Sequence, residues 1–122
     1  MIMTDQSTII SIDCGTQSLR VIIFAEDGSV LAKKQIMYKP YTSPRPGWAE
    51  QDPAVWWGAL CTGVAALKSS HPDLIARAKG IGVTAQRDTV ILIGKDGNVL
   101  RPAITWLDTR KARGRYHPNF IM

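Results

Sequence analysis

The chain begins with two short runs of apolar residues that have few polar interruptions, a pattern typical of buried β-strands. We predict strands at residues 8–13 and 19–25, joined by a tight turn that contains glycine. Asp27 and Gly28 then predict a hairpin turn into a third strand at about residues 29–38. Because that segment contains two lysines and a glutamine, we expect it to be an edge or half-exposed strand.

Residues 39–51 interrupt the pattern with three prolines and a glycine, which predict a loop. A helix from Pro53 to about residue 69 should follow. Asp52 can accept hydrogen bonds from the free amides of its first turn, and proline fits the first helical position. Gly58 and Gly63 weaken this helix in isolation and are interpreted as points of close packing on a sheet. The apolar side chains that should face the core are Trp56, Leu60, Val64 and Leu67.

The pattern after this helix predicts three further strands and a final helix that begins near Asp108. The strands are expected at residues 79–85, at residues 89–94 and near residues 99–104. Three hairpin-linked strands followed by a helical crossover predict an α/β fold, in which helices pack on a mixed sheet.

Composition limits the class of protein. The chain has 122 residues, of which 45% are hydrophobic and 20% charged, so it is expected to form one globular domain rather than a disordered segment. No apolar run approaches the roughly 20 residues of a membrane helix, and the N-terminus lacks the basic segment of a signal peptide, so we expect a cytoplasmic protein without a membrane partner. Cys14 and Cys61 are far apart in sequence and are expected to be free, buried thiols.

The net charge of +5 is concentrated near the C-terminus. Residues 1–100 carry ten basic and nine acidic side chains (+1), and residues 101–122 carry five basic and one acidic (+4). No ladder of aromatic residues accompanies these basic residues, as a strand-binding groove would need, so we expect no nucleic-acid partner. A solvated helix face, or a face that meets an acidic surface absent from this chain, is favoured. The basic residues concerned are Arg101, Arg110, Lys111, Arg113 and Arg115.

The turn between the first two strands has the chemistry of a phosphate site. Backbone amides around Gly15 could form an anion-binding nest, to which Thr16 and Ser18 add hydroxyl donors. Arg20 adds a guanidinium suited to phosphate. Asp13 would be repelled by phosphate unless a cation lay between them, which predicts Mg²⁺ held through water. The alternative is an ordinary hairpin with Arg20 in a surface ion pair.

Two later segments could contact a polyhydroxyl compound. Arg87 and Asp88 directly follow a predicted strand, and such a pair can donate to one hydroxyl and accept from its neighbour. Trp106 offers a flat apolar face, and Asp108 offers an acceptor. The alternatives are a solvated turn that holds an Arg–Asp pair, and a core tryptophan followed by a helix-capping aspartate.

Four stretches in this order resemble the N-terminal part of an FGGY-type carbohydrate kinase: residues 12–20, 46–57, 82–89 and 102–110. The resemblance covers about residues 8–113. It implies an incomplete ribonuclease-H-like, actin-like ATPase domain. It also implies transfer of the γ-phosphoryl group of ATP, with Mg²⁺, to a hydroxyl of a sugar or polyol.

The resemblance also assigns roles to individual residues. Asp13 would match the carboxylate near Mg²⁺, and Trp106 and Asp108 fall near the substrate pocket. The Arg87–Asp88 pair is more similar to glycerol kinases than to the methionine–histidine pattern of xylulose kinases. The first phosphate-binding loop would comprise Gly15, Thr16, Gln17, Ser18 and Arg20. The sugar contacts would include Gln86, Arg87 and Asp88.

Length is where the chain departs from the family. Members have two such domains with the active site between them, and residues 1–122 correspond to part of the first. The catalytic base, a second phosphate motif and the adenosine site would lie in the missing portion. We therefore expect a fragment that is inactive alone, whose partner is the remainder of the kinase chain. It should expose an apolar patch and self-associate.

Two rival functions belong to other classes. The first is a stand-alone binding module that keeps the fold without catalysis. The second is a nuclease, which needs several carboxylates around two metals. Asp13 has no acidic partner on the predicted helix at residues 53–69, so the sequence disfavours a nuclease.

Overall fold

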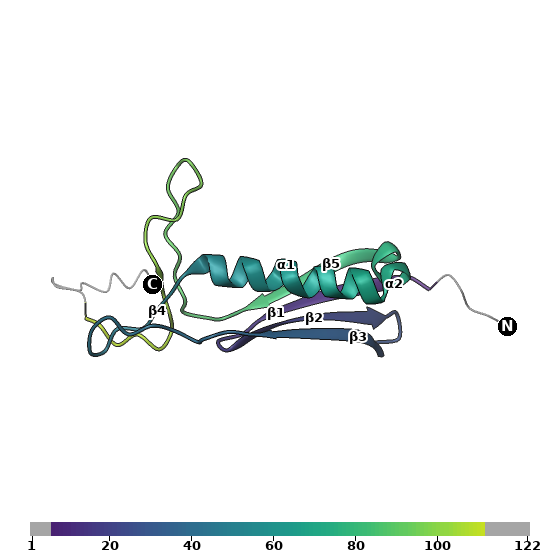
Figure 1. Ribbon diagram of the computed structural model, residues 1–122, viewed down its shortest axis with the longest axis horizontal. Helices are drawn as coiled ribbons and strands as arrows, with labels where there is room; N and C mark the ends of the chain where they lie inside the picture. Colours follow the sequence, from purple (N-terminus) through teal and green to yellow (C-terminus); the bar gives the residue numbers. More distant parts are fainter. Residues whose placement is uncertain (1–5, 112–122) are drawn as a thin grey trace, which may run out of the picture.

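The computed structural model describes residues 6–111, which form a four-stranded sheet with a long helix on one face (Figure 1). The spatial order of the strands is β3-β2-β1-β5. β1 is antiparallel to β2 and parallel to β5, and β2 is antiparallel to β3, so the predicted mixed sheet is confirmed. The strands are β1 (Thr8–Cys14), β2 (Ser18–Ala25), β3 (Val30–Met37) and β5 (Ala78–Ala85).

Helix α1 (Pro53–Ser70) begins where the sequence predicts. The Asp52 carboxylate accepts a hydrogen bond from the Ala54 amide at 2.9 Å, and Pro53 occupies the first turn. A second, short helix, α2 (Pro72–Ala76), follows α1 and is absent from the predicted elements. Proline is equally suited to the first turn of a new helix. Within the described range, neither helix is long and apolar enough to cross a membrane.

The core lies between α1 and one face of the sheet. Alternate side chains of β1 and β2 point toward α1, and the helix packs on β2 and β3. The predicted helical stripe is confirmed for Leu60, Val64 and Leu67, whereas Trp56 lines an apolar groove near the start of α1. Ala59 and Gly63 are more deeply buried than the larger Leu60 and Val64 beside them. A Cβ atom on Gly63 would lie 2.9 Å from Val21 Cγ2, whereas one on Gly58 would meet nothing within 4 Å. Close packing on the sheet therefore applies to Gly63 alone.

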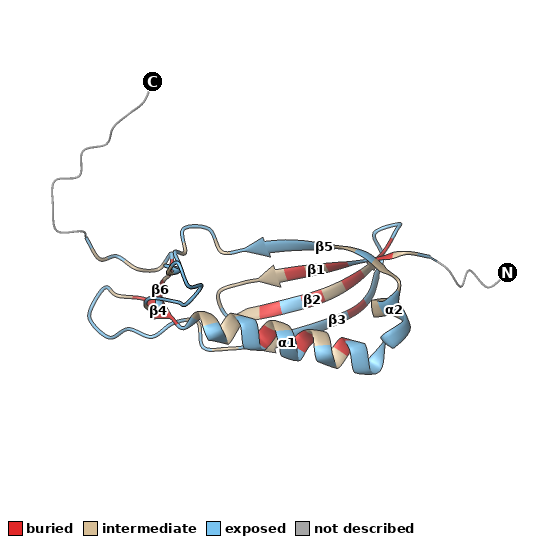
Figure 2. Ribbon diagram, turned by 90° about the horizontal axis from the view of Figure 1, so that it is seen from above, coloured by how far each residue is buried: buried red, intermediate tan, exposed pale blue. Residues whose placement is uncertain are grey.

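Strand β5 is not covered by the helix, as Figure 2 shows. Ile81 pairs with Ile10, and Val83 pairs with Ile12, so all four side chains lie on the face of the sheet that carries α1. Ile10 and Ile12 are buried, but Ile81 and Val83 are 65% and 69% exposed. An apolar groove of about 390 Å³ separates β5 from α1. The expected apolar patch is therefore present.

The segment after β5 differs from the prediction. Residues 89–94 and 99–104 do not form two strands, and they make isolated bridges such as Val90–Ile104. The segment projects from the sheet (Figure 1), and the apolar side chains of residues 90–93 and 99–100 are exposed, so no packed face in the described structure supports a regular ladder there. Only β6 (Ala103–Ile104) forms, and it pairs with β4 (Glu50–Gln51) inside the predicted loop.

Three smaller expectations also need correction. No helix begins at Asp108 in the described part of the chain, and any continuation beyond residue 111 lies outside it. Cys61 is exposed rather than buried, because it lies on the side of α1 that faces away from the sheet. Arg101 and Arg110 form ion pairs with acidic residues of the same chain and do not make a solvated face. Arg113 and Arg115 lie outside the described residues.

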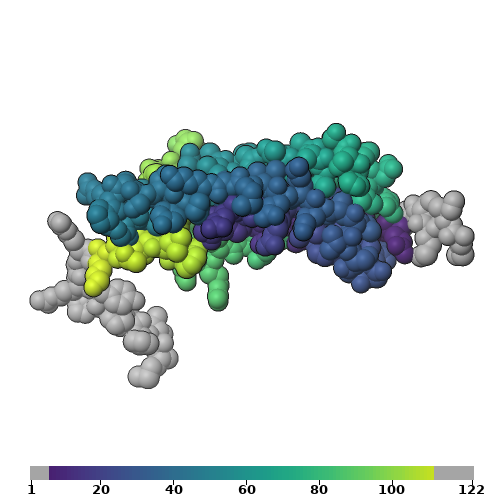
Figure 3. All heavy atoms as spheres, turned by 60° about the horizontal axis from the view of Figure 1, so that its bottom comes forward, coloured from purple at the N-terminus to yellow at the C-terminus, as the bar shows by residue number. Residues whose placement is uncertain are grey.

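These ion pairs join the loop before α1 to the last described segment, and we call them the arginine clamp (Glu50, Arg101, Asp108 and Arg110). Arg101 and Arg110 both bind Glu50, and Arg110 also binds Asp108. The Arg110 guanidinium stacks 3.8 Å from the centre of the Trp48 ring. Figure 3 shows the two segments lying against each other. The clamp thus holds the small β4–β6 sheet together.

We predict that Gly58→Ala and Gly63→Ala change stability in opposite directions. Gly58 has open space, so alanine should raise the free energy of unfolding by about 0.5–1 kcal/mol through helix propensity. At Gly63 the new methyl group meets Val21 at 2.9 Å, and the overpacking should produce a net loss of about 1 kcal/mol or more. Urea unfolding of both variants checks the prediction. A stabilised Gly63→Ala would contradict the packing.

We predict that the clamp weakens in acid. The Arg110 guanidinium holds the pKa of Asp108 well below its ordinary value. A lowered folded-state pKa gives stability that is present above the unfolded-state pKa of about 3.9 and is lost as the pH falls further toward the folded-state value. Asp108→Asn should therefore lower the melting temperature at pH 6 and have a smaller effect near pH 2. The exposed Asp73→Asn is the control. An Asp108→Asn effect that is equal at both pH values would contradict the role.

Candidate functional site

The turn between β1 and β2 is closed by its own backbone and tied to two other segments. The Gly15 amide donates to the Ser18 carbonyl at 2.9 Å, and a Cβ on Gly15 would lie 3.1 Å from that oxygen. The Gly15 carbonyl accepts from the Tyr38 hydroxyl at 2.6 Å and from Gln86 Nε2 at 3.0 Å. The turn is therefore held by residues that follow β3 and β5 as well as by its hairpin.

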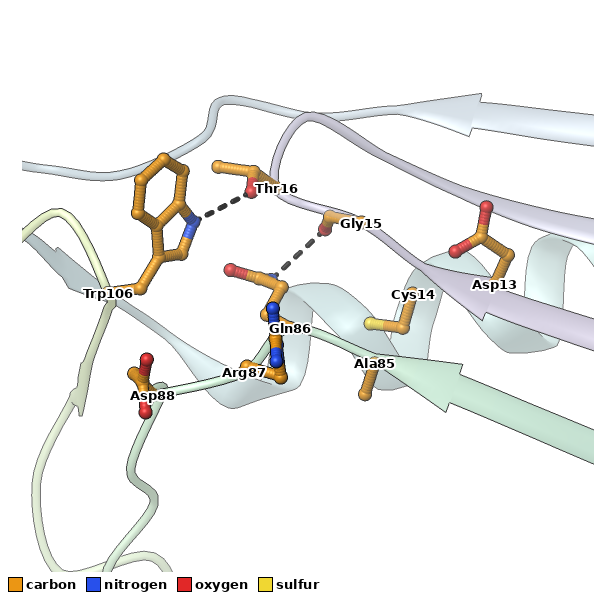
Figure 4. Close-up of a pocket in the computed structure, with 9 residues that line it drawn as sticks. All are labelled: Asp13, Cys14, Gly15, Thr16, Ala85, Gln86, Arg87, Asp88 and Trp106. Carbon is orange, nitrogen blue, oxygen red and sulfur yellow. Dashed lines mark hydrogen bonds between the residues drawn. The ribbon is translucent and has the colours of Figure 1, made fainter.

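A cavity of about 360 Å³ opens beside this turn, as Figure 4 shows. It brings together the three segments that the sequence analysis singled out separately. Trp106 reaches across it, and its indole Nε1 donates to Thr16 Oγ1 at 3.0 Å. The lining residues are Asp13, Cys14, Gly15, Thr16, Ala85, Gln86, Arg87, Asp88 and Trp106.

Two charged side chains of the lining, Arg87 and Asp88, have no partner among the described residues. In the part of the chain that the structure describes, neither Arg87 nor Asp88 makes a side-chain hydrogen bond or ion pair. The alternative of a turn that holds an Arg–Asp pair is therefore not observed. Asp88 adopts a left-handed backbone conformation with φ of 58°, which aspartate tolerates better than most residues. Both charges remain available to a ligand.

Asp13 and Arg20 face each other across the β1–β2 pair and form an ion pair. The Asp13 side chain is 28% exposed and lines the cavity, whereas Arg20 does not line it. The surface ion pair that we considered as an alternative for Arg20 is thus present. Within residues 6–111, no group of three or more His, Cys, Asp or Glu side chains could hold a metal. A cation at Asp13 would need other ligands, such as water and phosphate oxygens.

Three further predicted residues lie outside the cavity lining. Gln17 and Ser18 belong to the turn, and the Ser18 hydroxyl accepts a hydrogen bond from Gln35 Nε2 at 2.8 Å. The Asp108 carboxylate, whose side chain is 3% exposed, accepts from the Ala49 amide at 2.7 Å and binds Arg110. Asp108 is therefore engaged in the clamp. Trp106 is 52% exposed, so it is not the core tryptophan of the alternative interpretation.

The sequence analysis missed Cys14 and Tyr38. Cys14 lines the cavity, but burial raises the pKa of its thiol, so it remains protonated at neutral pH and is a poor nucleophile. Burial also raises the pKa of the Tyr38 phenol. No motif signalled either residue as part of the site. Cys14 lies at the site because its strand pairs with Ala85, and Tyr38 lies there because its hydroxyl donates a hydrogen bond to the turn.

Curated proteins similar to this chain include xylulose kinases and glycerol kinases. A xylulose kinase from Klebsiella pneumoniae is 40% identical over 103 residues, and a glycerol kinase from Thermococcus onnurineus is 40% identical over 108 residues. These alignments cover 84% and 85% of this chain but 21% of each relative. The chain therefore spans about a fifth of the length of the curated relatives it matches.

Solved structures agree with these relatives. The xylulose kinase of Rhodospirillum rubrum superimposes with a TM-score of 0.77 at 37% identity, covering 84% of this chain and 21% of that one. The glycerol kinase of Plasmodium falciparum, solved with ADP, superimposes with a TM-score of 0.69 at 29% identity, covering 86% and 21%. Residues 8–115 match the N-terminal domain of the FGGY family of carbohydrate kinases, and the chain therefore belongs to this family.

Proposed function

We propose that residues 1–122 form the N-terminal portion of the first domain of a kinase that transfers the γ-phosphoryl group of ATP to a hydroxyl of a sugar or polyol. The observation that carries this proposal is that one cavity brings a glycine turn together with an exposed tryptophan and with Arg87 and Asp88, which are unpaired within the described residues. Such a site combines donors for phosphate with groups for a polyhydroxyl acceptor.

The turn is the phosphate side of the proposed site. Backbone amides and the Thr16 hydroxyl would bind phosphate oxygens, with Gln17, Ser18 and Arg20 completing the loop. Thr16 Oγ1 accepts from Trp106, which leaves its own O–H hydrogen free to donate to an anion. Phosphoryl transfer depends mainly on positioning and charge stabilisation, so a turn fixed in advance is suited to this role.

Asp13 is the residue that would hold Mg²⁺. Its carboxylate lines the cavity close to the turn, and Mg²⁺ commonly takes one or two carboxylates together with water and substrate phosphates. When bound, the ion would neutralise charge on the phosphate oxygens. Arg20 keeps the Asp13 carboxylate in place by its ion pair and adds positive charge beside the turn. The donor set therefore fits a metal held mainly by water and nucleotide.

Arg87, Asp88 and Trp106 form the acceptor side. Arg87 can donate to one hydroxyl and Asp88 can accept from a neighbouring one, while the Trp106 ring packs against the carbon chain. The chemistry of this pair favours vicinal hydroxyls, as in a polyol. Gln86 lies beside the pair, although its amide nitrogen is engaged with Gly15. Asp108 would act indirectly by holding the segment that carries Trp106.

The remainder of the kinase chain is the proposed partner of the uncovered apolar surface. The groove between α1 and β5 is lined mainly by apolar side chains, and the Nε1 hydrogen of Trp56, which lines it, is buried without a partner in the described residues. The outer edge of β5 is unpaired within the described sheet. A further strand and helix from the missing four-fifths would satisfy both, and the catalytic base would lie there.

The acceptor should be sought first by ADP release from the complete kinase over ketoses, aldoses and polyols. Asp88→Asn should then raise the acceptor KM by about tenfold or more, because asparagine lacks the negative charge and keeps only one of the two acceptor oxygens. Asparagine tolerates the left-handed backbone, so the change isolates the charge. The ATP KM should not move. Asp96→Asn, in an exposed turn outside the cavity, is the matched control. A change confined to the ATP KM would show that Asp88 is misassigned.

We also predict that the 122-residue chain self-associates through β5. Val83→Lys should weaken the association by about tenfold or more, because a charge would enter the apolar groove and lysine protects exposed strand edges. Val30→Lys, at the opposite edge strand β3, is the matched control, since β3 already carries Lys33 and Lys34. Sedimentation velocity over a concentration series measures the effect. Equal association of both variants would contradict the role of β5.

A further inference from the structure

Tyr38 contacts the β1–β2 turn at two points. Its backbone amide donates to the Gln17 carbonyl at 3.0 Å, and its hydroxyl donates to the Gly15 carbonyl at 2.6 Å. The second distance is at the short end of the range for an O–H···O hydrogen bond. The Tyr38 side chain is partly buried against the core, so the hydroxyl is delivered from a fixed position. Tyr38 does not line the cavity and would not touch a ligand there.

The Gly15 carbonyl receives a second donor, Gln86 Nε2, at 3.0 Å. The peptide that joins Gly15 to Thr16 is planar and trans, so its N–H points away from its carbonyl. Holding the carbonyl between two donors therefore also sets the direction of the Thr16 N–H. Glycine would otherwise leave this peptide free to rotate, because it adopts a wider range of φ and ψ than any other residue.

We propose that Tyr38 is a positioning residue of the phosphate-binding turn: with Gln86, its hydroxyl holds the Gly15–Thr16 peptide so that the Thr16 N–H, not the Gly15 carbonyl, is presented to phosphate. The inference rests on the proposed function in taking the turn as the phosphate side. It adds a residue from the end of β3 that lies outside the cavity. If the peptide turned over, a carbonyl oxygen would face the phosphate and repel it.

The surroundings of the hydroxyl support this role. Burial, with the nearby Cys14 and Asp13, raises the pKa of the Tyr38 phenol, so the group keeps its hydrogen and remains a donor throughout the working pH range. The Cys14 thiol lies 3.9 Å from the same hydroxyl, a weak contact at most. The carbonyl of Gly15 is thus the strong acceptor available to Tyr38 in the described residues.

The test is Tyr38→Phe in the complete kinase, because phenylalanine keeps the packed ring and removes only the donor. Loss of one hydrogen bond should raise the ATP KM by about fivefold or more and leave the acceptor KM unchanged. Tyr41→Phe is the matched control, since Tyr41 is 37% exposed and has no side-chain bond to the turn. Hydrogen–deuterium exchange of the peptide that covers Gly15–Ser18 should quicken in Tyr38→Phe and not in Tyr41→Phe. A merely structural role would instead lower the melting temperature and move both KM values together.

Two control experiments distinguish failure of this inference from failure of the proposed function. Asp13→Ala should abolish turnover if the kinase assignment is right. If it does so while Tyr38→Phe leaves the ATP KM and the exchange of the turn unchanged, the inference is overturned and the proposed function stands. If the wild-type kinase turns over no acceptor, the proposed function fails. The inference is then judged by titrating the wild type and Tyr38→Phe with inorganic tripolyphosphate, where equal affinities overturn it and weaker binding by the variant supports it.

Discussion

The parallel pairing of β1 with β5 is the constraint on which the site depends. The pairing runs in register from Ile9 with Gly80 to Cys14 with Ala85, so both strands end at the same edge of the sheet. Residues that follow the two strands, more than 70 positions apart in sequence, must therefore lie side by side. Ligands bind at the carboxyl ends of strands in many open α/β sheets for this reason. The strand pairing brings the turn after β1 next to Gln86, Arg87 and Asp88 after β5, and the hydrogen bond from Gln86 to the Gly15 carbonyl joins the two segments in one cavity.

The two halves of the sheet differ in how far they are stabilised by packing within the described structure. The helix covers β2 and β3, and Gly63 lets it approach Val21 closely, so that half of the sheet has a complete core. The β5 half has the same alternation of apolar residues, but Ile81 and Val83 remain exposed because no element within residues 6–111 packs upon them. Strand β5 is thus held mainly by its backbone hydrogen bonds to β1, and its outer edge is unpaired in the described sheet. An arrangement of this kind is expected of a sheet that continues in another part of the protein.

Local signals in the sequence were sufficient for most of the elements. The first three strands followed from apolar runs and an Asp-Gly turn, and α1 followed from the Asp52-Pro53 cap, because each depends on neighbours within a few residues. The pattern failed at residues 89–94 and 99–104, where apolar content suggested strands but no layer of the described structure covers most of the apolar side chains. The surroundings of Asp108 were not predictable for a related reason. Arg110 is a local partner two residues away, but the hydrogen bond from the Ala49 amide joins distant parts of the chain, and no local motif encodes it.

Hydrogen bonds across the cavity distinguish the lining residues that hold the turn from those that remain available to a ligand. Gln86 Nε2 donates to the Gly15 carbonyl, and the Trp106 indole donates to the Thr16 hydroxyl. These two residues therefore use a hydrogen-bond donor to hold the turn. Arg87 and Asp88 make no such bonds in the described structure and keep their full capacity for a ligand. If the proposed function is right, recognition of the acceptor would rest on these two charges, and Gln86 and Trp106 would connect the acceptor to the turn. Movement of the Trp106 ring on acceptor binding would be felt directly by the Thr16 hydroxyl, which gives the two halves of the site a physical means of coupling.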